Sequence, residues 1–230
     1  MQGNTIEVPD SGLSCETIDP MIGGWVAKEE RVDRVLIPED RIGRRVKQLA
    51  REIYRDYAEE DELYLVAVLK GAADFLKDLK TALWWEICQH DGHGPKLRRD
   101  YVKASTYGKG IKSTRESERI VRIDFEPEEL EGKNVLLVED IVDQAFTLSH
   151  VRDLIGARNV RSSRTCALLE KRLANPTPEV RELRQKLTLD YVGFRVPECW
   201  VAGYGIDAGE DLRELPFIVV VNQAYYESRA

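Results

Sequence analysis

Residues 134 to 147 read NVLLVEDIVDQAFT, and this stretch indicates the class of fold. Residues 135 to 139 are apolar up to a final acid and do not alternate with polar residues, which is typical of a strand buried on both faces. Glu139 and Asp140 stand where such a strand should end, and Asp143 follows three residues later. Apolar residues at helical spacing come after Thr147, namely Leu148, Val151, Leu154 and Ile155. The stretch therefore predicts a strand, an acidic loop and a helix.

The acidic loop is expected to lie at a ligand site. In open α/β sheets, ligands bind outside the carboxyl ends of the strands, and the start of a helix offers free backbone N–H groups to a phosphate. Carboxylates beside a phosphate would repel it, so these acids are expected to hold ribose hydroxyls or a metal. The structural alternative is a buried strand that ends in an incidental acidic turn.

The same stretch resembles the phosphoribosyl pyrophosphate signature of the type I phosphoribosyltransferases, which is a strand followed by two acids, two apolar residues, an aspartate and a phosphate loop. The resemblance implies an α/β fold with a central, mostly parallel sheet flanked by helices, and a small hood lobe. It also implies that Asp143 is catalytic and manages the proton of the attacking base. It assigns to the phosphoribosyl and phosphate groups the residues Glu139, Asp140, Asp143, Gln144, Ala145, Phe146 and Thr147.

The phosphate loop departs from the family pattern in one place. The family usually has Asp-Thr-Gly or Asp-Thr-Ala there, whereas Asp143 is followed by Gln144 and Ala145, so the usual hydroxyl is missing. Backbone N–H groups at the start of the helix are expected to bind most of the phosphate. Ala145 can still donate, although a residue with a Cβ atom tolerates a positive φ poorly.

The composition is that of an ordinary globular protein. Of the 230 residues, 43% are hydrophobic and 33% are charged. No apolar run approaches the roughly 20 residues of a membrane span, and the N-terminus lacks the order of a signal peptide, so we expect a cytoplasmic protein without a membrane partner. Four scattered cysteines favour reduced thiols over zinc or disulfides. A net charge of −7 argues against a nucleic-acid partner.

A helix is expected from Pro38 onward, because apolar residues recur there at spacings of three and four. They are Ile42, Val46, Leu49, Ile53 and Tyr57. The basic residues of this segment are Arg41, Arg44, Arg45 and Lys47. We interpret these basic residues as a solvated helix face rather than as an anion site.

Residues 63 to 69 (LYLVAVL) predict a second buried strand, which ends at Lys70-Gly71 before another helix. In the purine enzymes that the chain resembles, this junction is the pyrophosphate loop, formed by Leu69, Lys70 and Gly71 with a cis peptide bond between the first two. On its own, the junction would be interpreted as a surface lysine and a glycine at a helix start.

Residues 89 to 110 are turn-rich and then polar, which predicts an exposed and mobile segment. His90 and His93 are not expected to bind a metal, because a third ligand is missing. In the family, a Ser-Tyr pair on a long loop closes over the reacting centre, and Thr106-Tyr107 occupies the corresponding place. Lys103 stands where a basic contact to the diphosphate is expected. The alternative interpretation is an exposed hairpin.

The C-terminal third again contains a buried strand that ends at charged residues. Residues 164 to 170 predict another buried strand before Lys171, and Thr177 with Pro178 predicts the start of a short charged helix that the family core does not need. Residues 190 to 221 resemble hypoxanthine-guanine phosphoribosyltransferases along their length, and with the earlier matches the resemblance covers about residues 40 to 222. It implies that Trp200 stacks on a purine and that the Val201 carbonyl contacts the base edge.

Three charged residues receive roles from the same resemblance. Lys171 is expected to donate to the exocyclic oxygen of a 6-oxopurine, which would reject adenine. Asp207 is assigned to Mg²⁺, together with Glu139 and Asp140, because this ion prefers a few carboxylates plus diphosphate and water. Arg213 is assigned to pyrophosphate.

The function expected from the sequence is purine salvage, in which phosphoribosyl pyrophosphate and hypoxanthine or guanine give IMP or GMP. The alternatives are a transferase for another base, such as xanthine, and a non-catalytic regulator that senses nucleotides. We expect an N-terminal extension over residues 1–35 that joins the hood or wraps the surface, a core over 36–172, and an insertion helix with the C-terminal hood over 173–230. We also expect a homo-oligomer, either a dimer or a tetramer.

Overall fold

The computed structural model describes residues 5–13, 20–107, 120–124 and 130–229. Its main sheet has the strand order β1-β8-β7-β6-β3-β4-β5, and neighbouring strands are parallel except for β4 with β5. The strands are β1 (Ile6–Glu7), β3 (Glu62–Leu69), β4 (Lys96–Tyr107), β5 (Ile120–Asp124), β6 (Asn134–Val142), β7 (Ser162–Lys171) and β8 (Tyr191–Val196). The expected α/β class with a mostly parallel central sheet is confirmed.

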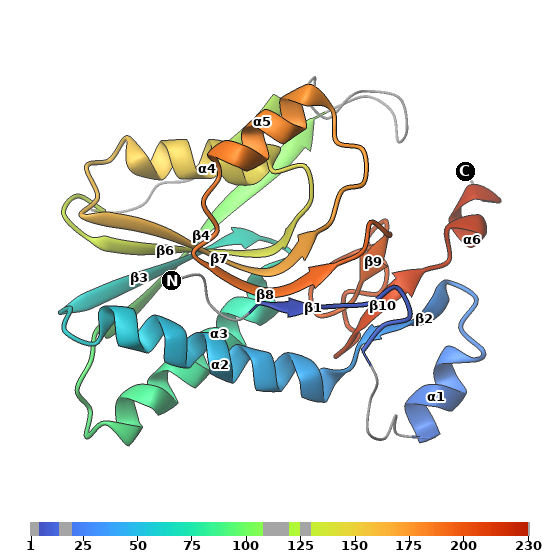
Figure 1. Cartoon of the computed structure of the whole chain (residues 1–230), viewed down its shortest axis with the longest axis horizontal. Helices are drawn as coiled ribbons and strands as arrows, with labels where there is room; N and C mark the ends of the chain where they lie inside the picture. Colours follow the sequence, from blue (N-terminus) through green and yellow to red (C-terminus); the bar gives the residue numbers. More distant parts are fainter. Residues whose placement is uncertain (1–4, 14–19, 108–119, 125–129, 230) are drawn as a thin grey trace.

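Helices cover both faces of the main sheet (Figure 1). On one face lie α2 (Glu39–Tyr57) and α3 (Ala73–Gln89), and on the other lie α4 (Phe146–Gly156) and α5 (Pro178–Lys186). Neighbouring residues of β3 therefore enter different cores, since Leu65 packs with α2 and α3 whereas Val66 packs with α4. This burial on both faces explains why the central strands are apolar without alternation.

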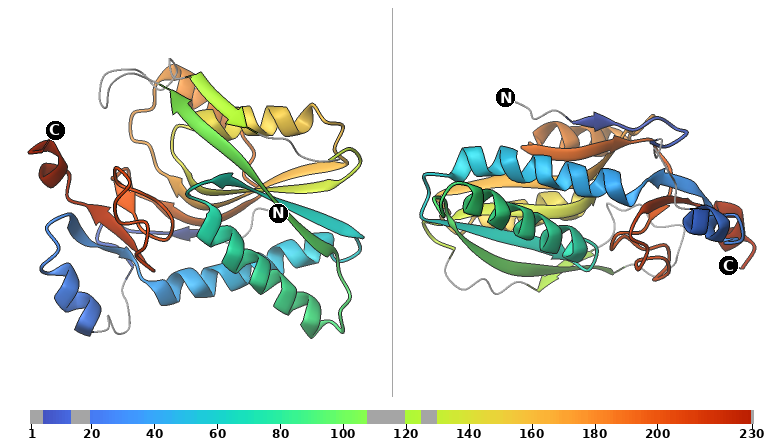
Figure 2. Two further views of the ribbon diagram at one scale, coloured as in Figure 1. Left: turned by 180° about the vertical axis from the view of Figure 1, so that it is seen from behind. Right: turned by 90° about the horizontal axis from the view of Figure 1, so that it is seen from below.

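A smaller antiparallel sheet lies at one end of the main sheet, beside α1 (Pro20–Val26) and α6 (Gln223–Glu227) (Figure 2). Its strand order is β2-β10-β9, with β2 (Val32–Ile37), β9 (Val201–Ala202) and β10 (Ile218–Val221). The N-terminal and C-terminal parts of the chain therefore build this sheet together.

Two strands lie outside the units in which the sequence analysis placed them. β8, expected in the insertion and hood segment 173–230, is an inner strand of the main sheet between β1 and β7. β1, expected in a hood or surface extension, pairs with β8, and the backbone N–H of Val8 continues the contact by donating to the Arg195 carbonyl at 2.8 Å. Parallel pairing joins segments that are distant in sequence, so composition does not reveal these boundaries.

β4 is the longest strand that the sequence analysis missed. Its sequence, KLRRDYVKASTY, is charged and was interpreted as turn and loop, but β4 lies next to the edge strand β5 and has few apolar residues. Thr106 and Tyr107, expected on a mobile loop, are the last residues of β4, and their backbones pair with Val121 and Ile120 of β5. This pairing corresponds to the hairpin alternative. Residues 108–119, which connect the two strands, lie outside the described residues.

The central stretch differs from the expectation in two details. β6 continues to Val142, so Glu139 and Asp140 are strand residues rather than loop residues. In α4, Leu148, Val151 and Ile155 are buried as expected, but Leu154 is 39% exposed. The start of α5 agrees with the prediction, because Thr177 accepts a bond from the Val180 N–H and Pro178 is the first helical residue.

Two observations concern the cysteines and the helices of the described part of the chain. Cys88, Cys166 and Cys199 have free thiols, and Cys15 lies outside the described residues. Among the helices that the structure describes, none combines the length and the apolar character that crossing a bilayer requires.

Arg45 corrects the interpretation of the basic face of α2 as wholly solvated. Its side chain is 1% exposed and donates to the backbone carbonyls of Val192 at 2.7 Å and Gly193 at 3.0 Å. Its Nη1 also pairs with Glu52 at 2.9 Å. Arg45 therefore ties α2 to β8, whereas Arg44 is exposed and pairs with Asp40 on its own helix.

We predict that Arg45→Met lowers the free energy of unfolding by about 3 to 5 kcal/mol, the usual cost of breaking a buried charge pair from one side. Arg44→Met is the matched control on the same helix, and its loss should stay within about 1 kcal/mol because its pair is exposed. Urea denaturation followed by circular dichroism measures both. Equal losses in the two variants would contradict the role assigned to Arg45.

Candidate active site

The predicted site residues come together where β3, β6 and β7 end. These strands are neighbours and run parallel, so their carboxyl ends lie along one edge. That edge carries the Lys70-Gly71 junction after β3, the acids and phosphate loop of β6, and Lys171 at the end of β7. The small sheet brings Trp200, next to β9, and the segment with Asp207 and Arg213, between β9 and β10, to the same end.

Glu139 and Asp140 are two adjacent carboxylates that are almost completely buried. Burial raises the pKa of Glu139 well above its ordinary value, and the neighbouring Asp140 adds to the effect. Burial also raises the pKa of Asp140 to about 6, although the Ile141 N–H donates to it and Arg213 lies nearby. One oxygen of Glu139, Oε2, is buried without a hydrogen-bond partner. Such a pair is suited to accept hydrogen bonds from ligand hydroxyls or to face a cation.

The Lys70-Gly71 junction is held between the main sheet and the small sheet. A Cβ atom on Gly71 would lie 1.8 Å from Oδ2 of Asp140, so a side chain there would displace the Asp140 carboxylate. On the other side, a Cβ atom on Gly205 would lie 2.3 Å from the Gly71 carbonyl oxygen. The Leu69–Lys70 peptide bond is cis, as the resemblance implies. Lys103, on β4, is the strand partner of Leu69 and is exposed beside this junction.

Internal carboxylates pair with two of the three cations assigned to pyrophosphate, Lys70 and Arg213. Lys70 Nζ lies 3.1 Å from Glu210, and Arg213 Nη2 lies 2.8 Å from Asp207 and 3.3 Å from the same Glu210. Arg213 also donates to the Gly205 carbonyl at 2.8 Å. The hydrogen bond from Lys70 is the main reason why the pKa of Glu210 is lowered. The sequence analysis missed Glu210, because no local pattern shows that it faces both cations.

Asp143 and Lys171 form an ion pair of 2.7 Å between the phosphate loop and the end of β7. Lys171 is 13% exposed and Asp143 is 39% exposed, so the pair opens toward solvent on the side of the acid. Burial raises the pKa of Cys199, the residue before Trp200, and the nearby charge of Lys171 partly offsets this increase.

Trp200 lies beside a second aromatic residue, Tyr226, which the sequence analysis did not single out. Trp200 is 37% exposed, and its ring lies 5.0 Å from that of Tyr226 of α6. Val201 is buried in β9, where it pairs with Val220 of β10. An exposed aromatic surface of this kind can stack on a flat ligand.

The segment expected to bind phosphate has one residue with an unusual backbone conformation. Ala145 is the residue before α4 and adopts φ of 73°, so a residue with a Cβ atom occupies the left-handed region there. The residue before α4, Ala145, makes no side-chain capping bond, so it leaves the first N–H groups of the helix available to a ligand. Phe146 and Thr147 form the first turn of α4, and Gln144 lies just before Ala145.

Comparison with known proteins identifies the family. Residues 38–203 match the family described as the phosphoribosyl transferase domain. The chain belongs to this family. Hypoxanthine phosphoribosyltransferase of Salmonella typhimurium is 36% identical over 185 residues, which are 80% of this chain and 92% of that protein. Hypoxanthine-guanine phosphoribosyltransferase of Bacillus subtilis is 35% identical over 197 residues, 86% of this chain and 97% of that protein.

Solved structures agree with the family assignment. Hypoxanthine phosphoribosyltransferase of Trypanosoma cruzi, in complex with the product IMP, matches 87% of this chain and 96% of its own with a TM-score of 0.67 at 30% identity. The type I phosphoribosyltransferase fold is thus established both by sequence and by structure.

The carboxylates of this phosphoribosyltransferase fit the expected Mg²⁺. Among the described residues, no group of three or more His, Cys, Asp or Glu side chains is placed to hold a metal. Mg²⁺ needs no such group, since it commonly uses one or two carboxylates and takes its other ligands from phosphates and water. Asp207 lies close enough to Asp140 to raise the pKa of that acid further, and carboxylate oxygens are the hard ligands that Mg²⁺ prefers. The donor set is therefore suited to an ion shared with a diphosphate.

We predict a specific pH dependence of stability for the ligand-free phosphoribosyltransferase in EDTA. Because the pKa of Asp140 rises from 3.8 to about 6 on folding, the folded protein binds a proton more readily than the unfolded chain in this interval. The stability contributed by protonated Asp140 is complete below pH 4 and is lost as the pH rises through 6. At about 1.4 kcal/mol per pKa unit, the parent should lose on the order of 2 to 3 kcal/mol of unfolding free energy as the pH rises through this interval. Asp140→Asn should not show this loss.

Urea denaturation at several pH values between 4 and 7 measures this difference. Asp153→Asn changes an exposed carboxylate of α4 and should follow the parent at every pH. If Asp140→Asn also followed the parent at every pH, the raised pKa would be contradicted.

Proposed function

We propose that this phosphoribosyltransferase transfers the phosphoribosyl group of phosphoribosyl pyrophosphate to hypoxanthine or guanine, giving IMP or GMP and pyrophosphate. The observation that carries the proposal is the 2.7 Å pair of Asp143 and Lys171, which joins the loop before α4 to the end of β7. One acid and one ammonium at this place match the two polar needs of a 6-oxopurine. The ring nitrogen must lose a proton, and the exocyclic oxygen must accept one hydrogen bond.

The base binds between the small sheet and the ends of the main strands. Trp200 stacks on the purine, the Val201 carbonyl contacts its edge, and Lys171 donates to the exocyclic oxygen. Adenine has an amino group at that position, which cannot accept this bond. The small sheet is then a hood over the base, and Thr106-Tyr107 is the pair that approaches the reacting centre from the β4–β5 side.

The other substrate occupies the edge along β3 and β6. Glu139 and Asp140 accept hydrogen bonds from the ribose hydroxyls, and the N–H groups at the start of α4 bind the 5′-phosphate. Lys70, the backbone at Gly71, Lys103 and Arg213 bind the diphosphate. Asp207, with Asp140 and Glu139, would hold Mg²⁺, and the bound ion would supply charge neutralisation for the leaving diphosphate.

The reaction forms one bond and breaks another at the anomeric carbon. The lone pair of the purine nitrogen forms the new C–N bond, and the C–O bond to the diphosphate breaks, with its electron pair leaving on the diphosphate. Asp143 takes the proton from the ring nitrogen. The products are a nucleoside monophosphate and pyrophosphate.

Pyrophosphate release by the purified protein tests this function. With phosphoribosyl pyrophosphate and Mg²⁺ present, we expect release with hypoxanthine and guanine and none with adenine, and xanthine is assayed in parallel. Binding of IMP without release for any base would contradict catalysis and favour the nucleotide-sensing alternative.

We predict that Asp143→Asn lowers kcat for hypoxanthine by about 10²- to 10⁴-fold, the usual value of a positioned general base. The KM for phosphoribosyl pyrophosphate should change only a few-fold, since backbone groups provide much of the phosphate contact. Asp153→Asn is the control for the charge change, and steady-state kinetics measure both variants. A parental kcat in Asp143→Asn would remove Asp143 from the mechanism.

We predict that Glu210→Gln tightens binding of Mg²⁺-pyrophosphate. The Glu210 carboxylate pairs with Lys70 and Arg213, so a diphosphate must displace it from both cations. The pairs are exposed, and the gain should therefore be modest, about two- to fivefold in Kd by isothermal titration calorimetry. Glu214→Gln removes the same charge from an exposed neighbour of Arg213, and its affinity for Mg²⁺-pyrophosphate should increase less. Weaker binding in Glu210→Gln would mean that Glu210 assists the ligand rather than competing with it.

We also propose that the enzyme works in the cytoplasm as a dimer or a tetramer. Light scattering coupled to size-exclusion chromatography tests the assembly.

A further inference from the structure

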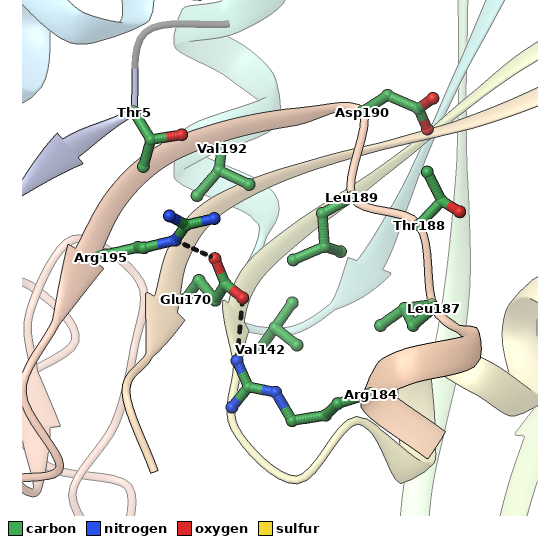
Figure 3. Close-up of a pocket in the computed structure, with 10 residues that line it drawn as sticks. All are labelled: Thr5, Val142, Glu170, Arg184, Leu187, Thr188, Leu189, Asp190, Val192 and Arg195. Atoms are coloured by element: carbon green, nitrogen blue, oxygen red, sulfur yellow. Dashed lines mark hydrogen bonds and ion pairs between the residues drawn. The ribbon is translucent and has the colours of Figure 1, made fainter. Parts of the chain in front are cut away.

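The short helix α5 reaches the active site through one side chain. It lies outside the main sheet beside α4 (Figure 1), and the sequence analysis interpreted it as an addition that the core does not need. Its last turn carries Arg184, whose side chain points back toward the ends of β6 and β7 (Figure 3). The helix is anchored at its other end by the Thr177 cap and the buried Val180.

Arg184 touches the backbone of both residues that we assign to the base. Its Nη1 donates to the Lys171 carbonyl at 2.8 Å and to the Asp143 carbonyl at 3.1 Å. Its Nη2 lies 2.9 Å from Glu170, which precedes Lys171 on β7. A planar guanidinium with several fixed N–H groups is suited to join three acceptors in one arrangement.

A second arginine holds the same carboxylate from the other side. Arg195 Nε of β8 lies 2.8 Å from Glu170, so that Glu170 is clamped between Arg195 and Arg184, as the dashed lines in Figure 3 show. The Arg195 side chain pairs with two acids, Glu170 and Glu7, whereas the Arg184 side chain also contacts the Asp143 and Lys171 carbonyls. The two arginines therefore share a partner and differ in their connection to the site.

We propose that Arg184 is a positioning residue that sets the separation of the Asp143 and Lys171 backbones and thereby the geometry of the base site. The inference rests on the proposed function insofar as these two side chains contact the base. Asp143 and Lys171 lie on different strand ends, and the side-chain ion pair between them must open when a base enters. The Arg184 contacts are made to the backbone and persist when that pair opens, so they keep the two side chains at the spacing that a purine needs.

The surroundings of Arg184 make the inference testable by substitution. A cavity of about 220 Å³ borders the clamp, with Leu187, Leu189 and Val192 among its lining residues (Figure 3). Arg184 and Arg195 both line this space, so an uncharged methionine at either position has room beside it. In either variant, Glu170 keeps one arginine partner.

Steady-state kinetics of Arg184→Met and Arg195→Met, measured with hypoxanthine and phosphoribosyl pyrophosphate, test the proposal. In Arg184→Met we expect the KM for hypoxanthine to rise about tenfold, as for the loss of one charge-assisted hydrogen bond, and the KM for phosphoribosyl pyrophosphate to change less than threefold. In Arg195→Met we expect both KM values to stay within twofold of the parent. A purely structural role would lower the folded fraction and the apparent kcat, and would leave the KM for hypoxanthine unchanged.

Arg184→Lys provides a second variant if Arg184→Met does not fold. Its ammonium keeps the charge but cannot reproduce the planar fork, so we expect a KM for hypoxanthine above that of Arg195→Met. A KM for hypoxanthine in the folded Arg184 variants equal to that of Arg195→Met would overturn the proposal. A parent protein that releases no pyrophosphate with any base would instead contradict the proposed function.

Discussion

The close approach at Gly71 is the constraint on which the site depends. The Asp140 carboxylate occupies the space of a Gly71 side chain on one side, and the Gly205 backbone contacts the Gly71 carbonyl on the other. A strand of the main sheet, the junction after a neighbouring strand, and the segment between β9 and β10 therefore meet with no room for a Cβ atom. Tyr204 reinforces this contact by donating to Asp78 of α3 at 2.7 Å. The small sheet is thus fixed over the strand ends by backbone contact.

The charges of the site divide into two halves with different chemistry. In one half the cations are already paired, since Lys70 and Arg213 face Glu210 and Asp207, and Lys171 faces Asp143. In the other half Glu139 and Asp140 are buried carboxylates with raised pKa values. An anionic substrate with a hydroxylated sugar matches this division, because its diphosphate can replace the internal acids and its hydroxyls can supply donors to the buried pair. A protein with a net charge of −7 can in this way bind an anion at cations that its own acids neutralise.

The N-terminal segment and α5 both contact the region at the end of β7. Arg172, directly after β7, donates to the Val8 carbonyl at 2.8 Å, and Leu13 of the N-terminal segment donates its N–H to Leu36 of β2 at 2.9 Å. The N-terminal segment therefore runs from the main sheet to the small sheet and contacts both. Together with α5 and Arg184, it stabilises the end of β7, where Lys171 must hold its position.

The sequence by itself determined the fold class, the central strands and the acidic stretch that leads from β6 to α4. Strands buried on both faces and the helix α2 can be predicted locally, because burial selects apolar residues at a fixed spacing, and the acids Glu139, Asp140 and Asp143 lie within five residues of one another. The tertiary structure alone decided the burial of Arg45, the strand character of β4, the place of β8 in the main sheet, and the contacts of Glu210 and Arg184. The two strands depend on backbone pairing with distant segments, and the charged contacts depend on which side chains meet across long stretches of sequence, as Lys70 and Glu210 do across 140 residues. Such a meeting leaves no periodic signal, since the same charged residue is equally compatible with solvent until the fold supplies its partner.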